Sequence, residues 1–483
     1  MEITGVTYST AHYEHYNQNG DRNYFEEVID AMILGEIAGM NETFRAAISN
    51  LPRDRKRMTI LSLLEKDIKL FNKIKALVDK DINKMEHIKD VVLMLREYVK
   101  IADVEKKKYG EVMTSLDLVK LLLSDLDNSV WSNPNLKWLD SCNGSGPFLI
   151  MVIYKLMNGL KDWEPDDEKR YKHIVENMIY AGELQPKNMF LYMCAVDPFD
   201  KYKLNVYTGS FLEKEFDYHM KNVWNVDKFD IVIGNPPYQN GKDSNFYVKF
   251  IDKFYQIAKE NSSLLYVVPN RFFQPSHKAH KAIVKSEIKV VYHNLNDYFP
   301  GISTHIGSFL LENRKPTTTK VLCVFKNEKS IIDINSPLPT DTRMSSIVYK
   351  NLLDKIINKF DKIEFSKLDG DLYIKRQWKR WNSITEIGGD HVFNIVFEYD
   401  AERDGKDGKW VKCTDIQKME WYLSKSNIVR FLTKMFASAM NVPPFVWTII
   451  PNIDLSKINN NQDLYEVFNL TTEEIKIIEE NLR

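Results

Sequence analysis

The segment FDIVIGNPPYQ, residues 229–239, constrains the fold and the chemistry of this chain more than any other segment does. Its apolar run, Ile231–Ile233, predicts a buried strand that ends at Gly234. The two prolines that follow cannot continue a sheet or begin a tight helix without cost, so the backbone after the strand stays extended and stiff. We therefore expect the strand to deliver a rigid tetrapeptide to its carboxyl end, formed by Asn235, Pro236, Pro237 and Tyr238.

The tetrapeptide offers a pair of hydrogen-bond acceptors beside an aromatic ring. The side-chain oxygen of Asn235 and a proline carbonyl both accept hydrogen bonds, and together they suit a planar NH2 group. Tyr238 can stack on the ring that carries such a group. The alternative interpretation is purely structural, namely a strand that ends in a rigid proline turn.

Length and composition are those of a globular protein with several domains. The 483 residues suffice for two or three domains, and hydrophobic and charged residues make up 44% and 28% of the chain. The formal net charge is −1, so any surface that binds nucleic acid must be a local one. The four cysteines lack the spacing of a zinc site or a disulfide framework, and we expect no metal. The polar N-terminus and the lack of long apolar runs predict a cytoplasmic location without membrane spans.

The pattern of the sequence changes twice along the chain, which predicts three parts. Residues 1–104 carry apolar residues at helical spacing and predict a helical N-terminal region. Residues 105–325 alternate short apolar runs with longer helical segments, the pattern of a Rossmann-like α/β domain. Residues 326–483 contain more polar stretches and end in a helix that Thr471 and Glu474 open with capping-box spacing.

Six short apolar runs in the α/β part predict strands of a mostly parallel sheet that helices cover on both faces. These runs are Lys137–Leu139, Met178–Ala181, Leu204–Tyr207, Ile231–Ile233, Leu264–Val268 and Val290–His293. Helices are expected between them, for example at Phe148–Met157, Pro186–Cys194 and Phe246–Ala258. Sites in such sheets lie beyond the carboxyl ends of the strands, so polar groups that follow strands are the candidates.

Three of these strands are followed by groups that suit a nucleotide-like cofactor. After the first strand, Gly144 and Gly146 let the backbone turn tightly and approach a ligand closely. After the second, Glu183 places a carboxylate that can accept both hydroxyls of a ribose, although the start of a helix also favours a carboxylate there. After the third, Ser210 can contact an adenine edge and Phe211 can pack on the face of the base.

The order of these segments resembles that of the gamma-type amino-methyltransferases of DNA, and in particular the Eco57I-like adenine-specific methylases. The stretch Lys108–Thr114 looks like their first cofactor motif, and the glycine loop, Glu183, Ser210-Phe211 and the Asn-Pro-Pro-Tyr tetrapeptide follow in the order of that family. The resemblance covers roughly residues 105–325 and extends more weakly to the end of the chain. It implies that S-adenosylmethionine is the cofactor and that it is bound by Thr114, Asp140, Asn143, Gly144, Gly146, Phe148, Glu183, Ser210 and Phe211.

The chain departs from the family pattern at several positions. Ser115 and Ser141 stand where proline is usual, Asn143 stands where cysteine is usual, and Pro147 stands where asparagine is frequent. Ser210 replaces the aspartate that usually contacts the adenine of the cofactor, and a hydroxyl is a weaker acceptor than a carboxylate. We therefore expect modest affinity for the cofactor.

The resemblance implies methyl transfer to N6 of an adenine in double-stranded DNA. Hydrogen bonds from both amino protons to Asn235 and to the Pro236 carbonyl would draw the nitrogen toward tetrahedral geometry and aim its lone pair at the methyl group. The base must first be flipped out of the duplex. Tyr238 should stack on one face of the base and Phe309 on the other, although a core phenylalanine on a strand is an equal alternative for Phe309. No Pro-Cys dipeptide occurs, which argues against methylation of cytosine at carbon 5.

A basic and aromatic cluster in the last part of the chain is the candidate DNA-binding surface. The segment KRQWKRW, residues 375–381, interleaves cations that bind phosphates or guanine with tryptophans that stack or wedge. The alternative is an exposed basic face with anchoring tryptophans. The candidate residues are Arg376, Trp378, Lys379, Arg380 and Trp381.

Three other functions fit parts of the sequence. Asn-Pro-Pro-Tyr enzymes also methylate protein glutamine or RNA guanine, but the large segment 326–483 that follows the catalytic part favours DNA. A fused restriction nuclease needs a metal-binding carboxylate pair and a lysine, and segments such as Asp103–Lys107 are poor matches. The intact run Asn235–Tyr238 argues against the third alternative, a DNA-binding protein whose cofactor site has decayed. The sequence does not define the oligomeric state, and it leaves open a separate restriction endonuclease as a partner.

Overall fold

The computed structural model describes residues 114–197, 201–240, 243–300, 302, 304–326, 328–339, 344–366, 370–376, 395–397, 408–436 and 444–482. The predicted helical N-terminal region, residues 1–104, lies outside these residues. The chain divides into two compact units: unit 1 comprises Met1–Pro269 and Lys281–Val321, and unit 2 comprises Asn270–His280 and Leu322–Arg483. The assignment of residues 105–325 to a catalytic domain and of 326–483 to a target-recognition domain stays a prediction.

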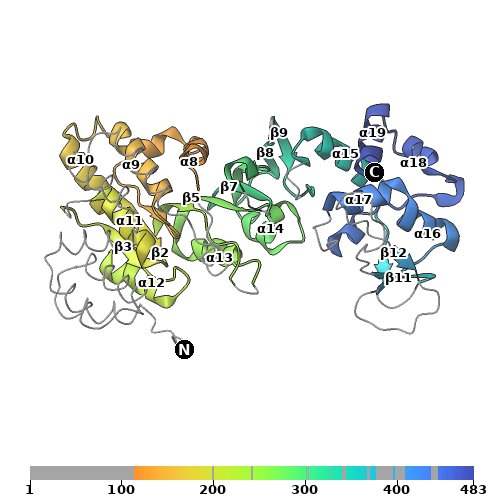
Figure 1. The fold of residues 1–483 in the computed structure, drawn as a ribbon, viewed down its shortest axis with the longest axis horizontal. Helices are drawn as coiled ribbons and strands as arrows, with labels where there is room; N and C mark the ends of the chain where they lie inside the picture. The colour runs from red at the N-terminus through yellow and green to blue at the C-terminus, as the bar shows by residue number, and fades with distance from the viewer. Residues whose placement is uncertain are drawn as a thin grey trace, which may run out of the picture. The chain divides into compact units, whose positions relative to one another are not determined.

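A mostly parallel sheet forms the centre of unit 1 (Figure 1). Its strands there are β1 (Trp138–Asp140), β2 (Ile179–Glu183), β3 (Asn205–Thr208), β4 (Phe229–Gly234), β5 (Ala258–Pro269), β6 (Glu287–Tyr292) and β7 (Ile306–Glu312). Their order is β3-β2-β1-β4-β5-β7-β6, in which neighbours from β3 to β5 are parallel and β7 is antiparallel to both β5 and β6. The six predicted strands are all present, and the predicted Rossmann-like α/β class is confirmed. β7 was not predicted.

The chain reverses its winding direction between β1 and β4. From β1 it winds outward through β2 and β3, and it then returns to place β4 on the other side of β1. The register pairs Asp140 of β1 with Ala181 of β2 and with Ile233 of β4. The chain therefore leaves β1 toward β2 and leaves β4 toward β5, in opposite directions along the sheet, and sheets of this kind bind their ligands at such a point.

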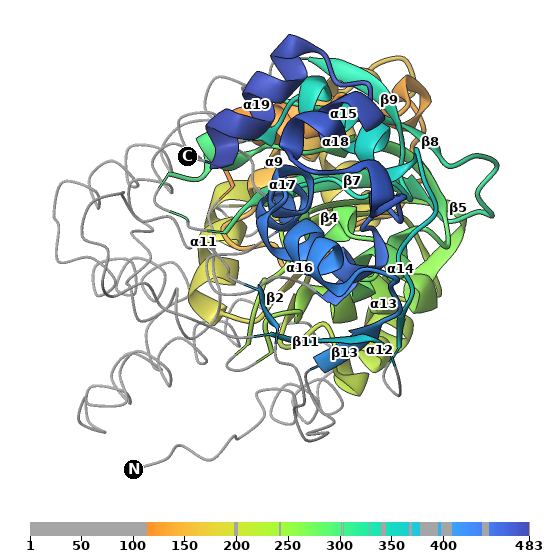
Figure 2. The ribbon, with the colours of Figure 1, turned by 90° about the vertical axis from the view of Figure 1, so that its right-hand side faces the viewer.

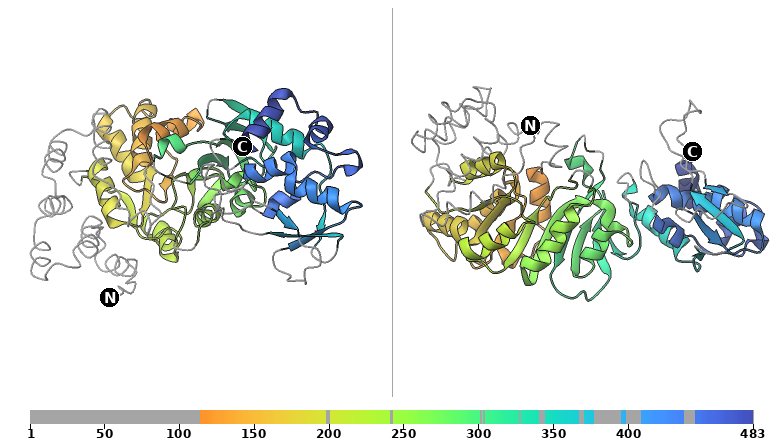
Figure 3. Two further views of the ribbon diagram at one scale, coloured as in Figure 1. Left: turned by 45° about the vertical axis from the view of Figure 1, so that its right-hand side comes forward. Right: turned by 90° about the horizontal axis from the view of Figure 1, so that it is seen from below.

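Helices accompany the strands of unit 1, and those that follow α8 lie between the strands in the sequence (Figure 3). They are α8 (Leu116–Leu123), α9 (Pro147–Gly159), α10 (Asp167–His173), α11 (Pro186–Val196), α12 (Lys214–Tyr218), α13 (Tyr247–Ile257) and α14 (Lys278–Ile283), the last of which spans the sequence boundary between the units. α9 contacts β2, α11 contacts β2 and β3, and α13 contacts β5. The three predicted helices correspond to α9, α11 and α13 and are confirmed. Among the described residues, no helix has both the length and the apolar character that crossing a membrane requires.

Unit 2 has a sheet and helices of its own. Figure 2 shows α16 and α17 above strands β11 and β13. The strands are β8 (Lys320–Val324), which begins at the end of unit 1, β9 (Lys329–Asp333), β10 (Phe365–Ser366), β11 (Leu372–Arg376), β12 (Ile395–Phe397) and β13 (Gly408–Val411). The last four form an antiparallel sheet in the order β10-β13-β11-β12. The helices are α15 (Ile347–Ile357), α16 (Ile416–Lys425), α17 (Asn427–Phe436), α18 (Asn461–Val467) and α19 (Thr472–Leu482).

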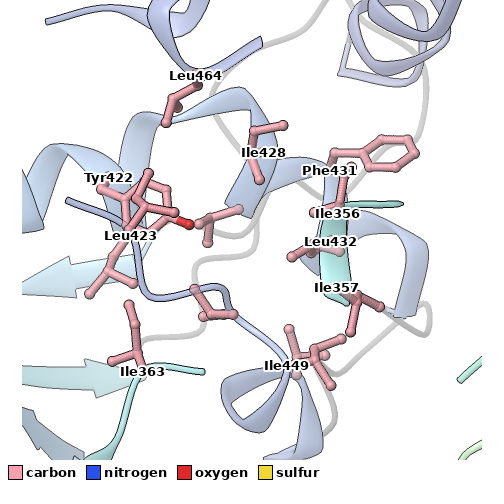
Figure 4. Packing of buried hydrophobic residues seen from close by; sticks show 14 of the residues in the cluster. Ile356, Ile357, Ile363, Tyr422, Leu423, Ile428, Phe431, Leu432, Ile449 and Leu464 are labelled. Atoms are coloured by element: carbon pink, nitrogen blue, oxygen red, sulfur yellow. The ribbon is translucent and has the colours of Figure 1, made fainter. Parts of the chain in front are cut away.

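A cluster of buried apolar side chains joins the helices of unit 2 (Figure 4). α16 contributes Tyr422 and Leu423, and α17 contributes Phe431 and Leu432, all of them fully buried. The Tyr422 hydroxyl donates to the carbonyl of Pro451 at 2.9 Å, so the polar end of this ring is satisfied inside the cluster. Unit 2 therefore has an apolar core of its own.

The predicted capping box at the start of α19 is confirmed. The Oγ1 of Thr471 accepts the Glu474 N–H at 3.2 Å, and the Glu474 carboxylate accepts the Thr471 N–H at 2.7 Å. Thr471→Ala is expected to destabilise the protein by about 1 kcal/mol, measured by urea denaturation, because it removes one of these bonds. Thr472→Ala, one residue further and also exposed, should cost less than about 0.5 kcal/mol. Equal losses in the two variants would show that the cap does not hold the end of the helix.

Candidate active site

The carboxyl ends of β1, β2 and β4 bring several predicted site residues together. Asp140 ends β1, Glu183 ends β2, and Gly234 ends β4 directly before the tetrapeptide Asn235–Tyr238. Because β1 lies between β2 and β4 and all three are parallel, these ends share one edge of the sheet. The predicted delivery of the tetrapeptide to the end of a buried strand is confirmed.

Gly234 forms the sharp turn from β4 into the tetrapeptide. Its φ of +144° lies in a region that L side chains rarely adopt. A Cβ atom at this position would lie 2.6 Å from Oδ1 of Asp140 and 3.1 Å from Sγ of Cys142. The tetrapeptide therefore begins in close contact with the loop that follows β1, and only glycine leaves the space that this contact requires.

The side chain of Asn235 is held by the segment that precedes α8. Its Nδ2 donates to the Oγ1 of Thr114 at 3.1 Å, across 121 positions of the sequence. The backbone N–H of Asn235 donates to the thiol of Cys142. Burial raises the pKa of the Cys142 thiol well above its usual range, so the thiol stays neutral. These contacts join the end of the first motif, the glycine loop and the tetrapeptide in one place.

The side chain of Tyr238 lies inside the protein in this structure. It is 7% exposed, and burial raises the pKa of its hydroxyl well above the usual value, while the neighbouring Asn235 side chain opposes the shift. Pro236 is buried and Pro237 is half-buried. Stacking on a substrate ring requires Tyr238 to expose a face of its own ring, so this role stays a prediction.

The loop after β1 is fixed to β2 by its backbone. The N–H of Asn143 donates to the carbonyl of Gly182 at 2.9 Å. Gly146, with a φ of +93°, precedes α9, and a Cβ atom there would clash with the ring of Tyr192. Phe148 is 1% exposed on α9, so the structure gives this predicted cofactor residue a place in the core.

Glu183 is a buried carboxylate that two backbone donors hold in place. Its Oε2 accepts the N–H of Gly144 and its Oε1 accepts the N–H of Gln185, both at 2.8 Å. The residue is only 7% exposed. These bonds fix the carboxylate beside the glycine loop, at the position where the resemblance expects it to accept the hydroxyls of a ribose.

Asp140 is a carboxyl group in an enclosed position. It is 1% exposed, and burial raises its pKa to about 8, although the Cys142 N–H donates to its Oδ1 at 3.0 Å and opposes the shift. The negative charge of Glu183 raises the pKa further. Two neighbouring carboxyl groups in such a place favour a cationic ligand, because a positive charge relieves their repulsion.

The raised pKa of Asp140 has a consequence for stability in the ligand-free protein. Between about pH 4 and about pH 8 the folded state keeps a proton that the unfolded state has released, so the free energy of unfolding should fall as the pH rises through this range. Asp140→Asn keeps the shape of the side chain but cannot ionise, and it should flatten this fall. Urea denaturation at a series of pH values measures both profiles. The same slope in the asparagine variant would assign the pH dependence to another group.

The two residues predicted to act after β3 contribute less to the site than expected. The end of β3 itself supplies a candidate residue that the sequence analysis did not name. Ser210 is half-buried, and its Oγ accepts a backbone N–H of its own turn at 3.4 Å. Phe211 is 3% exposed and stacks on Phe250, with ring centroids 5.4 Å apart.

Thr208 pairs with Glu183 in register, which places both side chains on the same face of the sheet. Its buried hydroxyl has no hydrogen-bond partner within the described part of the chain, and only the strand pairing reveals it as a candidate.

The predicted DNA-binding residues lie in two parts of the chain. Phe309 is fully buried in β7, paired with Tyr266 of β5 and Val291 of β6. This is the core position that the alternative interpretation describes, so the structure gives no support for contact with a base. The backbone of Arg376 ends β11. The remaining candidates fall outside the described residues, namely Trp378, Lys379, Arg380 and Trp381.

Residues 114–299 match the family model of the Eco57I restriction-modification methylase. This range contains the glycine loop, Glu183 and the tetrapeptide, so the resemblance expected from the motifs is confirmed for this part of the chain. A protein from Mycoplasma pneumoniae named an uncharacterized adenine-specific methylase is 25% identical over 349 residues, which cover 55% of this chain and 79% of the relative.

Solved structures are similar to the chain at low sequence identity. A crystal structure assigned as the modification subunit of a type I restriction enzyme from Vibrio vulnificus YJ016 is 14% identical, with a TM-score of 0.38. The match covers 59% of this chain and 60% of that subunit, so the chain spans less than two thirds of its length. The M protein of the type I restriction enzyme EcoKI is 16% identical with a TM-score of 0.36, over 65% of this chain and 70% of that protein.

Proposed function

We propose that this chain transfers a methyl group from S-adenosylmethionine to N6 of an adenine in double-stranded DNA. The observation that carries the proposal is the position of Asn235, which β4 delivers to the sheet edge that also carries Asp140 and Glu183, and whose amide is bonded to Thr114. The match of residues 114–299 to the Eco57I methylase family supports it. The similarity to the Mycoplasma pneumoniae protein named an uncharacterized adenine-specific methylase supports the choice of adenine.

The target group is a planar amine and a weak nucleophile, because its lone pair is delocalised into the purine ring. The Asn235 side-chain oxygen and the Pro236 carbonyl accept hydrogen bonds from its two N–H groups. These bonds return electron density to the nitrogen and hold its lone pair in line with the methyl group, so catalysis consists of positioning and electrostatic stabilisation. The neutral thiol of Cys142 takes no part in the transfer.

The groups at the sheet edge fit S-adenosylmethionine. When bound, this cofactor supplies a methyl group on a positively charged sulfur. Glu183, fixed by two backbone donors, would accept hydrogen bonds from the ribose hydroxyls. The enclosed carboxyl of Asp140 favours a cationic ligand, whose charge lowers the pKa of that carboxyl again. Thr208 adds a buried hydroxyl on the face of Glu183, in the region where Ser210 replaces the usual aspartate.

The target base reaches this edge only after it has left the duplex. Tyr238 turns outward from its buried position and stacks on the everted base, which compensates part of the cost of unstacking. Residues 326–483, with the cluster at 375–381, hold the DNA and select the sequence. The enzyme acts in the cytoplasm, where its substrate DNA is found, either alone or beside a separate restriction endonuclease.

A comparison of substrates tests this proposal. The purified protein is incubated with methyl-labelled S-adenosylmethionine and, in parallel, with duplex DNA, RNA and protein, and the DNA is then digested to nucleosides for mass spectrometry. We expect label in DNA alone, as N6-methyladenine. Label confined to RNA or protein contradicts the proposed substrate, and cleavage of plasmid with Mg2+ would add a nuclease to the activity.

A further inference from the structure

We infer that Thr114 is a positioning residue for methyl transfer, because it holds the Asn235 amide in the orientation that presents its oxygen to the amino group of the substrate. The family resemblance assigns Thr114 to the cofactor. In the structure, the Thr114 hydroxyl instead accepts a hydrogen bond from Nδ2 of Asn235 at 3.1 Å. The inference rests on the proposed function and adds to it a residue that acts through Asn235.

Thr114 is itself held firmly. It directly precedes α8, whose first turn is capped by the next residue, Ser115. The Oγ of Ser115 accepts the N–H of Leu118 at 3.3 Å, and its carbonyl accepts the N–H of Val119 at 3.0 Å. Thr114 and Ser115 are 9% and 6% exposed. The serine that stands where the family has proline therefore provides a side-chain cap that proline lacks, and it anchors the residue that contacts Asn235.

The orientation of the Asn235 amide matters because its two ends are chemically different. When Nδ2 faces Thr114, Oδ1 points away from Thr114 and has the acceptor character that an amino proton needs. An amide rotated by 180° would instead turn an N–H toward the amino group, and two donors would face each other. The Thr114 hydroxyl holds one end of the amide by this bond, and its loss leaves the amide free to rotate, so a smaller fraction of enzyme molecules presents Oδ1 to the amino group.

Two substitutions separate this role from a contact with the cofactor. Thr114→Val keeps the shape of the side chain and removes the hydroxyl, whereas Thr114→Ser keeps the hydroxyl. We expect Thr114→Val to lower kcat about 10- to 100-fold, by analogy with the loss of a hydrogen-bond partner that orients a metal ligand. The Kd for S-adenosylmethionine, measured by calorimetry, should stay within about twofold of the wild-type value. Thr114→Ser should recover most of the wild-type kcat, which a merely structural defect would not explain.

Two results obtained with Thr114→Val would overturn the inference. A valine variant with a raised Kd for S-adenosylmethionine and an unchanged kcat would make Thr114 a cofactor contact, as the resemblance implies. A valine variant with wild-type kcat and Kd would show that the hydroxyl is dispensable. If circular dichroism shows the valine variant to be unfolded, Thr114→Ala takes its place. For this variant too we expect a lower kcat and an unchanged Kd for S-adenosylmethionine. A wild-type protein that methylates no duplex DNA overturns the proposed function together with this inference, whereas an active wild type with unaffected variants overturns the inference alone.

Discussion

Asn235→Ala is expected to lower the rate of methyl transfer to duplex DNA by about 10³-fold or more, while the fold and DNA binding stay intact. Removal of one preorganised polar group at a reacting centre costs about 10²- to 10³-fold in kcat, and here the amino group also loses its alignment with the methyl donor. The side chain is half-buried and polar, so the substitution opens no large apolar cavity. Transfer of labelled methyl groups measures the rate, and a mobility shift with duplex DNA measures binding.

Asn158→Ala is the matched control for this substitution. Asn158 is exposed on α9, and its Nδ2 donates to the carbonyl of Tyr154 in the same helix at 3.1 Å. We expect this variant to transfer methyl groups at close to the wild-type rate. Full activity in Asn235→Ala would place the transfer elsewhere in the chain, and a loss of DNA binding in that variant would mean that Asn235 shapes the DNA-binding surface.

Gly234→Ala is expected to impair both stability and activity. The added methyl group meets Oδ1 of Asp140 at 2.6 Å, and the φ of +144° disfavours any side chain. Backbone strain and overpacking of this kind together cost about 3 kcal/mol or more in the free energy of unfolding. Relief of the clash must move the tetrapeptide away from the loop after β1, so methyl transfer should fall as well. Urea denaturation and the transfer assay measure the two effects.

Gly182→Ala tests whether any methyl group added near this edge is equally harmful. Gly182 lies in β2, and a Cβ atom there would meet the carbonyl oxygen of Ser141 at 3.5 Å, an ordinary van der Waals contact. We expect a change in the free energy of unfolding of less than about 1 kcal/mol. If both variants lose the same stability, the contact between Gly234 and Asp140 is not what requires glycine.

Local patterns account for the features of the fold and site that the sequence predicts well. The apolar run Ile231–Ile233 predicts a buried strand, and the glycine and two prolines that follow predict where it ends. β4 ends at Gly234 as expected. A polar group directly after an apolar run indicates a strand end at the site edge, which is where Glu183 lies. The capping box at Thr471 is equally local, because its two partners are three residues apart.

Contacts between distant segments account for the features that the sequence did not predict. β7 lies between β5 and β6 and runs antiparallel to both, and no local pattern in Ile306–Glu312 specifies its neighbours or direction. That position buries Phe309, which the order of the motifs had suggested for contact with a base. The bond between Thr114 and Asn235 joins residues 121 positions apart, so neither periodicity nor spacing reveals it.

Single-molecule sequencing of DNA from cells that express either the wild-type chain or Asn235→Ala tests the central claim most directly. We expect N6-methyladenine at one recurring sequence context in cells with the wild-type chain and unmodified adenine at the same positions in cells with the variant. Unmodified adenine in both samples, or the same modification in both, would contradict methyl transfer to adenine at the tetrapeptide.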